Sequence, residues 1–303
     1  MVLTTEICDI KLKNPLISAS GILDEHGYSM LRLLDSGTSA VTTKSIGMNE
    51  REGNLNPTVV EVEGGLINGM GLPNPGIDNF GDEIKIIKRE RKEAKVIGSI
   101  FADTPENFSF LAKRMEGYGV CAVELNLSCP HAKGFGAEIG SNPENVLQIT
   151  REVKKSVSIP VFVKLTPNVT SIVELAKACE EGRADAVVAI NTVRAMKIDI
   201  NAGMPVLNCK IGGLSGKSIK PIGVRCVYEI ASEVELPVVG VGGIMSGEDA
   251  IEYMMAGAKV VQIGSAIYYR ELDVFKKINN EIESFLDERN LELGDIVGMA
   301  LKR

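Results

Sequence analysis

The sequence lacks an excess of positive charge. Its 303 residues include 33 Lys and Arg against 40 Asp and Glu, which gives a formal net charge of −7. Proteins that bind nucleic acid usually carry a basic surface, and anionic membrane surfaces also attract basic segments. The acidic balance therefore argues against both kinds of partner.

The sequence also lacks long hydrophobic runs and metal-binding cysteine pairs. No stretch of about eighteen apolar residues is free of charge, and the N-terminal stretch "MVLTTEICDIKLKNP" has no apolar segment typical of a secretory signal. The six cysteines form no CxxC pair, so the sequence predicts neither a zinc site nor an iron–sulfur cluster. We expect a cytoplasmic protein with free thiols and no metal site.

The sequence does contain eight short apolar runs, each bounded by Pro, Gly or a charged residue. They cover residues 15–20, 39–45, 96–101, 121–128, 160–165, 185–191, 237–243 and 259–265. Most of them alternate with stretches of helical periodicity; in one, Thr104 is the expected cap and Pro105 fills the first turn. Apolar strands between amphipathic helices indicate a parallel sheet covered on both faces. Eight such units predict a (β/α)₈ TIM barrel, an α/β fold, as a single domain over residues 1–303.

Two connections are too long for simple turns. Residues 46–76 follow the second predicted strand and are rich in Gly, Asn and Pro, and residues 192–219 follow the sixth. Long connections in a compact domain are usually lids or binding loops. We expect both to be inserted loops on the C-terminal face of the barrel, where barrel enzymes carry their active sites.

Glycines end the last two predicted strands, in "VGVGGIMSGED" and "QIGSAI". Glycine lets a ligand approach the backbone closely, and barrels commonly hold a phosphate beside these two strands. Tight turns are the alternative explanation. Gly240 and Gly242 have no third glycine at the spacing of a dinucleotide fingerprint. The pattern favours a mononucleotide phosphate over NAD.

Polar side chains end several other predicted strands. Lys44 and Lys164 each end an apolar strand, where an ammonium needs an anionic or polar partner. We interpret them as charge complements to a bound anion, with exposure of the ammonium to solvent as the alternative. Asn126 and Asn191 carry both a donor and an acceptor, which suits a ligand with amide-like edges. Asn68 has the same chemistry but is equally typical of a turn.

Cys129 stands out among the cysteines. It follows the fourth predicted strand in "NLSCPH", ahead of the glycine-containing "AKGFG". A free thiol has a pKa of about 8.5, which suits a general base. No His–Asp pair is evident that would make it a protease-type nucleophile. We predict that Cys129 acts as a general base, whereas His131 is interpreted as a loop residue.

With these residues laid out, the chain resembles the class 1 dihydroorotate dehydrogenases over essentially its whole length. Nine ordered motifs carry the resemblance: "PLISASG" (15–21), "TTKSIG" (42–47), "NGMGLPNPG" (68–76), "NLSCPH" (126–131), "VKLTPN" (163–168), "AINT" (189–192), "GGLSG" (212–216), "VGVGGI" (239–244) and "QIGSAIY" (262–268). The set is far more specific than any one motif.

The resemblance implies a (β/α)₈ barrel that binds one FMN and oxidises (S)-dihydroorotate to orotate in pyrimidine synthesis. Matched position by position, the implied FMN contacts are Ser20, Lys44, Ser45, Asn126, Lys164, Ile190, Gly216, Gly242, Gly243, Gly264 and Ser265. The implied substrate contacts are Lys44, Asn68, Gly69, Met70, Gly71, Leu72, Asn126, Asn191 and Thr192.

The resemblance also implies a mechanism. Cys129 removes a proton from C5 of dihydroorotate while C6 delivers hydride to the flavin, and Lys164 stabilises the negative charge left on the reduced flavin. A cysteine base is typical of class 1. The membrane-bound class 2 enzymes use serine and carry an N-terminal membrane segment, which we do not expect here.

Within class 1, "NLSCPHAKGFGAEIGSNPENV" is more similar to type B than to the fumarate-using type A. Type B implies a partner subunit that carries FAD and an iron–sulfur cluster and passes electrons to NAD, in a heterotetramer around a homodimer core. One departure is Ser99, where the family often has asparagine.

Three alternatives stay open at this point. One is the fumarate-using type A enzyme. Another is an FMN barrel like that of dihydropyrimidine dehydrogenase, which shares the "NLSCPH" signature and acts on uracil or thymine. The last is a barrel that binds a phosphate-bearing ligand without catalysis. They differ in their electron acceptor, in their substrate and in whether the protein is coloured.

Overall fold

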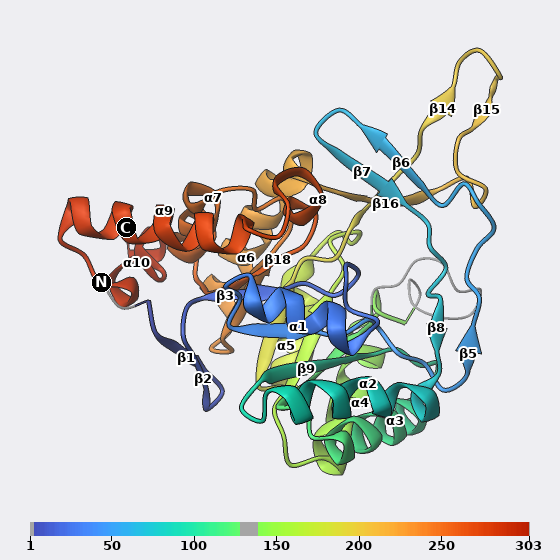
Figure 1. Ribbon diagram of the computed structural model, residues 1–303, viewed down its shortest axis with the longest axis horizontal. Coiled ribbons are helices and arrows are strands. Elements are labelled where there is room, and N and C mark those ends of the chain that lie inside the picture. The colour runs from blue at the N-terminus through green and yellow to red at the C-terminus, as the bar shows by residue number, and fades with distance from the viewer. Residues whose placement is uncertain (1–2, 128–138, 303) are drawn as a thin grey trace.

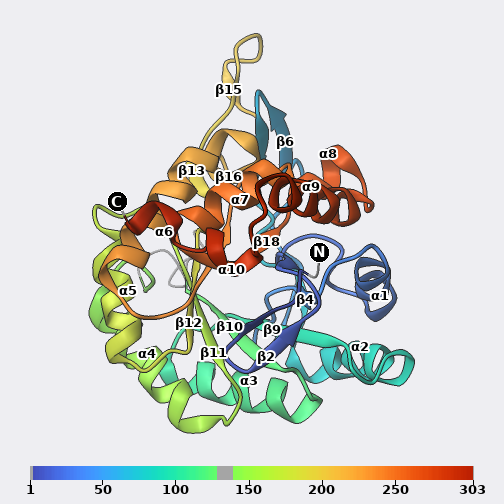
Figure 2. The ribbon, with the colours of Figure 1, turned by 90° about the vertical axis from the view of Figure 1, so that its left-hand side faces the viewer.

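Eight parallel strands close into a barrel in the computed structural model, which describes residues 3–127 and 139–302 (Figures 1 and 2). The barrel strands are β3 (Leu16–Ser18), β4 (Ala40–Thr42), β9 (Lys95–Ile100), β10 (Ala122–Asn126), β11 (Val161–Leu165), β12 (Ala186–Ala189), β17 (Val238–Val241) and β18 (Ala258–Ile263). They follow chain order around the barrel, and β18 pairs with β3 to close it. Each overlaps one of the eight predicted runs. The predicted (β/α)₈ barrel is confirmed.

Helices surround the barrel, as Figure 2 shows. They are α1 (Gly27–Asp35), α2 (Ile77–Glu90), α3 (Pro105–Tyr118), α4 (Pro143–Ser156), α5 (Ile172–Glu181), α6 (Lys220–Glu233), α7 (Gly247–Met255), α8 (Ala266–Arg270), α9 (Val274–Arg289) and α10 (Leu293–Ile296), with short 3₁₀ turns η1 (Lys217–Ile219) and η2 (Met299–Lys302). Thr104 caps α3 as predicted, since its hydroxyl accepts the N–H of Asn107 at 3.2 Å. Within residues 3–127 and 139–302, no helix has both the length and the apolar composition needed to cross a bilayer.

A short N-terminal hairpin packs against the inside of the barrel. It consists of β1 (Thr5–Ile7) and β2 (Ile10–Leu12), and its Ile10 belongs to the same buried cluster as Phe162 and Val239 of the barrel interior. Alternate residues of each strand point inward, so this cluster is separate from the larger one between strands and helices. The interior of the barrel near the N-terminal ends of its strands is therefore a packed core, which we call the lower core. This leaves the C-terminal ends of the strands for a site.

The two long connections lie at the C-terminal face of the barrel, as expected, and parts of them form short strands. They build a four-stranded antiparallel sheet in the order β13 (Val193–Ala195), β16 (Gly212–Ser215), β7 (Gly65–Asn68), β6 (Val59–Val62). We call it the inserted sheet. Two smaller pairs join β5 (Glu50–Arg51) to β8 (Asn74–Pro75) and β14 (Ile198–Asp199) to β15 (Met204–Pro205). The sheet depends on pairing between the two connections, β7 with β16, which no local pattern can reveal.

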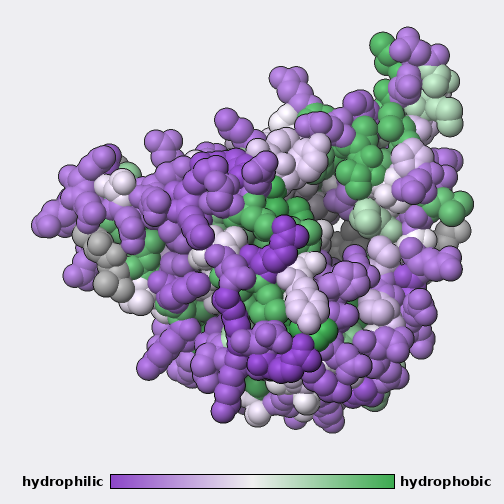
Figure 3. Space-filling model, viewed as in Figure 1, coloured by the Kyte–Doolittle hydropathy of each residue, from purple (hydrophilic) through white to green (hydrophobic). Residues whose placement is uncertain are grey.

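The inserted sheet rises to one side of the barrel mouth, and the β14–β15 hairpin projects furthest from the barrel (Figure 1). The hairpin carries exposed Ile198, Ile200 and Met204, and apolar side chains gather along this part of the surface (Figure 3). Glycine allows the close pairing at the base of the sheet: a Cβ on Gly65 would lie 2.0 Å from the carbonyl oxygen of Ser215.

The packed lower core predicts the effect of truncating Phe162. Its side chain is fully buried inside the barrel, so Phe162→Ala is expected to lower the free energy of unfolding by about 3–5 kcal/mol. Chemical denaturation measures the change, and Tyr28→Ala on the exposed face of α1 serves as control. A loss below about 1 kcal/mol for Phe162→Ala would contradict the packing described.

Candidate active site

A cavity of about 430 Å³ lies at the barrel mouth, between the strand ends and the inserted sheet. Its volume falls within the range of about 300–1,000 Å³ typical of small-molecule sites. Its lining comes from the ends of most barrel strands and from the segments that follow β4 and β12. The parallel arrangement brings these ends together, because all eight strands point the same way.

Sixteen of the predicted site residues line this cavity: Ser20, Lys44, Ser45, Asn68, Met70, Gly71, Leu72, Asn126, Lys164, Ile190, Asn191, Thr192, Gly242, Gly243, Gly264 and Ser265. Gly69 and Gly216 lie next to the lining instead. A Cβ on Gly69 would lie 2.2 Å from Sγ of Cys209, and one on Gly216 would lie 2.5 Å from Cα of Gly65. Both glycines therefore serve close packing of the inserted segments. Cys129 lies outside the described residues.

Glycines make one end of the cavity. Gly242 and Gly243 have φ of 124° and 72°, in the left-handed region that other residues rarely adopt. A Cβ on Gly243 would also lie 2.7 Å from the carbonyl oxygen of Gly216. Gly264 differs, since a Cβ there would contact only Ala19, at 3.4 Å. A side chain at Gly264 would fit the protein but would take up space at the edge of the cavity.

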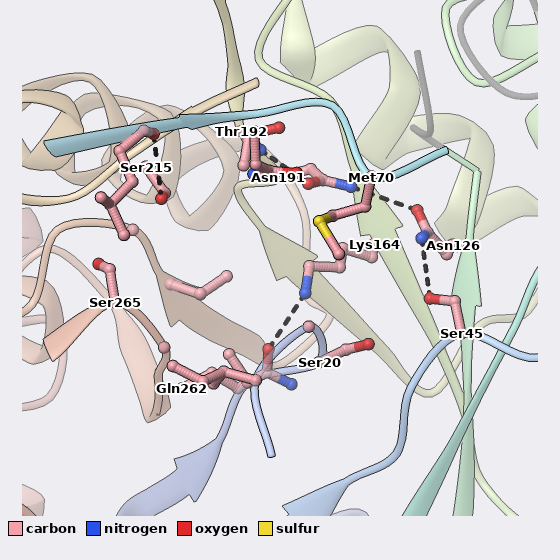
Figure 4. Close-up of a pocket in the computed structure, with 18 of the residues that line it drawn as sticks. Ser20, Ser45, Met70, Asn126, Lys164, Asn191, Thr192, Ser215, Gln262 and Ser265 are labelled. Carbon is pink, nitrogen blue, oxygen red and sulfur yellow. Dashed lines mark hydrogen bonds between the residues drawn. The ribbon is translucent and has the colours of Figure 1, made fainter. Parts of the chain in front are cut away.

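A chain of hydrogen bonds forms the other end (Figure 4). The Ser99 and Ser45 hydroxyls are 2.8 Å apart, and Nδ2 of Asn126 donates to the Ser45 hydroxyl at 2.9 Å. Nδ2 of Asn191 donates to Oδ1 of Asn126 at 3.2 Å, and Oδ1 of Asn191 accepts the Thr192 N–H at 2.7 Å. These bonds fix the orientation of both amides. Ser99 is fully buried behind Ser45, so it supports the lining without contributing to it.

Lys164 and Gln262 line the middle of the cavity, between the glycine end and the asparagine end (Figure 4). Nζ of Lys164 lies 3.4 Å from Oε1 of Glu124 and 3.5 Å from Oε1 of Gln262. The side chain of Lys164 is 7% exposed and that of Glu124 is 0% exposed. The anionic partner expected for Lys164 is therefore supplied, at least in part, by the protein itself.

Glu124 and Gln262 were missed as site residues from the sequence, although a signal for each exists. Glu124 precedes Asn126 by two residues and Gln262 precedes Gly264 by two. A strand has a period of two, so each points to the same side as the predicted residue. A charged or amide side chain at an inward position of an apolar strand is the pattern to look for.

The rim carries a second lysine and a buried acid. Lys44 forms an ion pair with Glu25 at 3.4 Å, and its backbone N–H donates to the carbonyl oxygen of Asp24. The Asp24 carboxylate accepts the N–H of Gly21, which lines the cavity. Burial raises the pKa of Asp24 to about 6, against lowering contributions from the Gly21 N–H and from Lys44.

Comparison with known proteins identifies the family. A family model described as dihydroorotate dehydrogenase matches residues 2–286. The chain belongs to the dihydroorotate dehydrogenase family. The membership expected from the nine motifs is thereby confirmed. In the part of this family member that the structure describes, no cluster of His, Cys, Asp and Glu is arranged to hold a metal ion.

Three relatives in this dihydroorotate dehydrogenase family share the name "Dihydroorotate dehydrogenase B (NAD(+)), catalytic subunit". The one from Methanocaldococcus jannaschii is 56% identical over 301 residues, covering 99% of this chain and 98% of the relative. The one from Thermoplasma acidophilum is 54% identical, covering 99% of both chains. The one from Pyrococcus abyssi is 49% identical, covering 99% of this chain and 100% of the relative. These names agree with the predicted similarity to type B.

The raised pKa of Asp24 predicts a pH-dependent stability in this dihydroorotate dehydrogenase family member. Between pH 3.8, the ordinary pKa, and about 6, the folded protein holds a proton that the unfolded chain releases. Stability therefore falls as the pH rises through this window, by about 3 kcal/mol in total. Asp24→Asn lacks this contribution. The difference in unfolding free energy between wild type and variant is expected to decline by most of that amount from pH 4 to pH 7, and a constant difference would contradict the assignment.

Proposed function

We propose that this chain is the catalytic subunit of a type B, NAD-linked dihydroorotate dehydrogenase, which oxidises (S)-dihydroorotate to orotate in pyrimidine synthesis. One observation carries the proposal: a single cavity joins a glycine-lined end to an asparagine-lined end, with the buried Lys164 between them. The names of the full-length relatives support the same activity. We also propose that residues 1–303 form one FMN-binding domain.

FMN fits the chemistry of this cavity. The left-handed glycines Gly242 and Gly243 and the open position at Gly264 allow a phosphate close to the backbone. Ser265 adds a hydroxyl donor at the same end, and Lys164 supplies a cation for the flavin ring. Ser20, Lys44, Ser45, Asn126 and Ile190 complete the proposed contacts along the lining, with Gly216 beside them. When bound, FMN accepts the two electrons that leave the substrate.

The asparagine end suits the pyrimidine ring. Asn126 and Asn191 present donors and acceptors in orientations fixed by their mutual hydrogen bond, and Thr192 extends the same set. Lys44 at the rim offers a positive charge for the carboxylate of the substrate. Asn68, Met70, Gly71 and Leu72 line the cavity from the inserted segment, next to Gly69. Cys129, which lies outside the described residues, is the proposed base that takes the proton from C5.

Transfer of electrons to NAD requires a partner in this proposal. The sequence has no dinucleotide fingerprint and no CxxC pair, and the relatives are named as catalytic subunits. We propose a second subunit that carries FAD and an iron–sulfur cluster. Two copies of each chain then form a heterotetramer around a homodimer of this chain.

The visible spectrum of the purified chain tests the proposed activity. A yellow protein is expected, and adding dihydroorotate without oxygen should bleach its flavin absorbance, whereas dihydrouracil should not. A colourless protein that fails to bind added FMN would contradict the FMN-dependent function. Bleaching by dihydrouracil instead would indicate a uracil-reducing enzyme, and reoxidation of the chain alone by fumarate would indicate type A.

The role of Cys129 can be tested separately. Cys129→Ser should retain FMN while flavin reduction by dihydroorotate at neutral pH slows by about 10²–10⁴-fold, the usual contribution of a general base. The matched control is Cys121→Ser. Cys121 directly precedes β10, at the N-terminal end of that strand, and the flavin of this variant should be reduced by dihydroorotate at the normal rate. Stopped-flow absorbance gives both rates. A near-normal rate for Cys129→Ser would rule out the general-base role.

A further inference from the structure

Glu124 is the most deeply buried acidic side chain near the cavity, and it does not line the cavity itself. It lies on β10, two residues before Asn126, and its side chain is 0% exposed. Lys164 on the neighbouring strand β11 is in register with Asn126. Glu124 therefore lies one layer below the lining, inside the barrel.

Both carboxylate oxygens of Glu124 have partners. Oε1 faces Nζ of Lys164 at 3.4 Å, and Oε2 accepts Nε2 of Gln262 at 2.7 Å. Oε1 of Gln262 faces Nζ of Lys164 at 3.5 Å, which closes a triangle of three side chains. Nε2 of Gln262 also contacts the Thr42 hydroxyl at 3.4 Å. The network thus ties together β10, β11, β18 and β4 inside the barrel.

A buried carboxylate is costly, and it is retained only where a partner compensates it. Here the two partners that compensate Glu124 are both residues that line the cavity, Lys164 and Gln262. Simple packing of the barrel interior does not require a charge, because Phe162, which is in register with Glu124 on the neighbouring strand, and Val239 are apolar residues of the same interior. The position of the acid points to the two side chains above it.

We propose that Glu124 is a positioning residue that holds the Lys164 ammonium and the Gln262 amide in place and aims both at the flavin. This inference rests on the proposed function, because it assumes FMN in the cavity. Lys164 has three N–H donors, so contacts to Glu124 and Gln262 leave donor capacity for a ligand. We call Lys164 and Gln262 the floor of the cavity. Glu124 acts on the charge of this floor through Lys164 and does not contact the cofactor.

Few other charges act on this floor. Among the described residues that line the cavity, Lys44 is the other ionisable group, and it is paired with Glu25 at the rim. Thr42 and Gln262 are neutral. Removing the Glu124 charge should therefore leave the charge of the Lys164 ammonium uncompensated beside the flavin.

The first test measures the reduction potential of the FMN-loaded protein against a reference dye, with dithionite as reductant and no dihydroorotate. In Glu124→Gln, one negative charge is lost while the amide can still bond to its neighbours. At neutral pH the ratio of reduced to oxidised FMN should rise at least tenfold, which equals about 30 mV for a two-electron couple. A potential equal to that of wild type would overturn the proposal.

Asp185→Asn is the matched control. Asp185 pairs with Lys154 at 2.7 Å near the start of β12, at the opposite end of the barrel. The change is again from a carboxylate to an amide beside a lysine, so it has the same chemistry without access to the cavity. It should leave the potential unchanged. A shift equal to that of Glu124→Gln would show a general charge effect and overturn the specific role.

A second variant separates action through Lys164 from direct action. In a Lys164→Gln background, adding Glu124→Gln should shift the potential by less than it does in the wild-type background, because the ammonium that Glu124 holds in place is gone and only the direct effect of the lost charge remains. An equal shift in both backgrounds would overturn the positioning role. The comparison also holds when Glu124→Gln alone fails to fold, since the double variant removes both buried charges and is expected to fold. Failure of the double variant to fold would likewise contradict action through Lys164.

Melting temperatures of the FMN-free protein test the pairing of Glu124 with Lys164 without relying on the proposed function. Each single variant leaves one buried charge unpaired and should lower the melting temperature by about 5–15 °C, while the double variant should lower it less than either. Additive losses would overturn the pairing of Glu124 with Lys164. A wild-type chain that cannot bind FMN would instead refute the proposed function, whatever the outcome of this cycle.

Discussion

Pairing of β18 with β3 is the contact on which the site depends. Without it the eight strands would form an open sheet, and their carboxyl ends would not meet. Closure brings Ser20 at the start of the chain close to Gly264 near its end, while pairing of β10 with β11 places Asn126 beside Lys164. The functional side chains come from several strand ends, so the barrel acts as the frame that fixes their separations.

The inside of this frame changes character along its axis. Near the N-terminal hairpin the interior is apolar, with Phe162 fully buried. Nearer the mouth, Glu124, Lys164 and Gln262 replace hydrophobic packing with a hydrogen-bonded set. Lys164 and Gln262 of this set also line the cavity. The charged layer is tolerable because each of its members is satisfied by another.

Much of the barrel could be predicted from the sequence, because each strand is a local apolar run. Residues at strand ends could be assigned to the mouth for the same reason, and Lys164 and Gly243 are examples. The strand period could have shown that Glu124 points into the barrel, but its hydrogen bond to Gln262, 138 positions away, could not be predicted from the sequence. Ser99 could be seen to differ from the family, but its support of Ser45 required coordinates. Contacts between distant segments leave no periodic trace in either segment.

The pairing of the two inserted segments has a consequence for how the protein is made. Asn68 of β7 and Gly213 of β16 are partners separated by 145 residues. A ribosome adds about 5–20 residues per second, so the edge of β7 waits on the order of 10 s for its partner to be synthesised. An unpaired strand edge invites pairing with another chain during that time. The nascent β6–β7 hairpin is thus one segment of this enzyme that a chaperone could usefully shield.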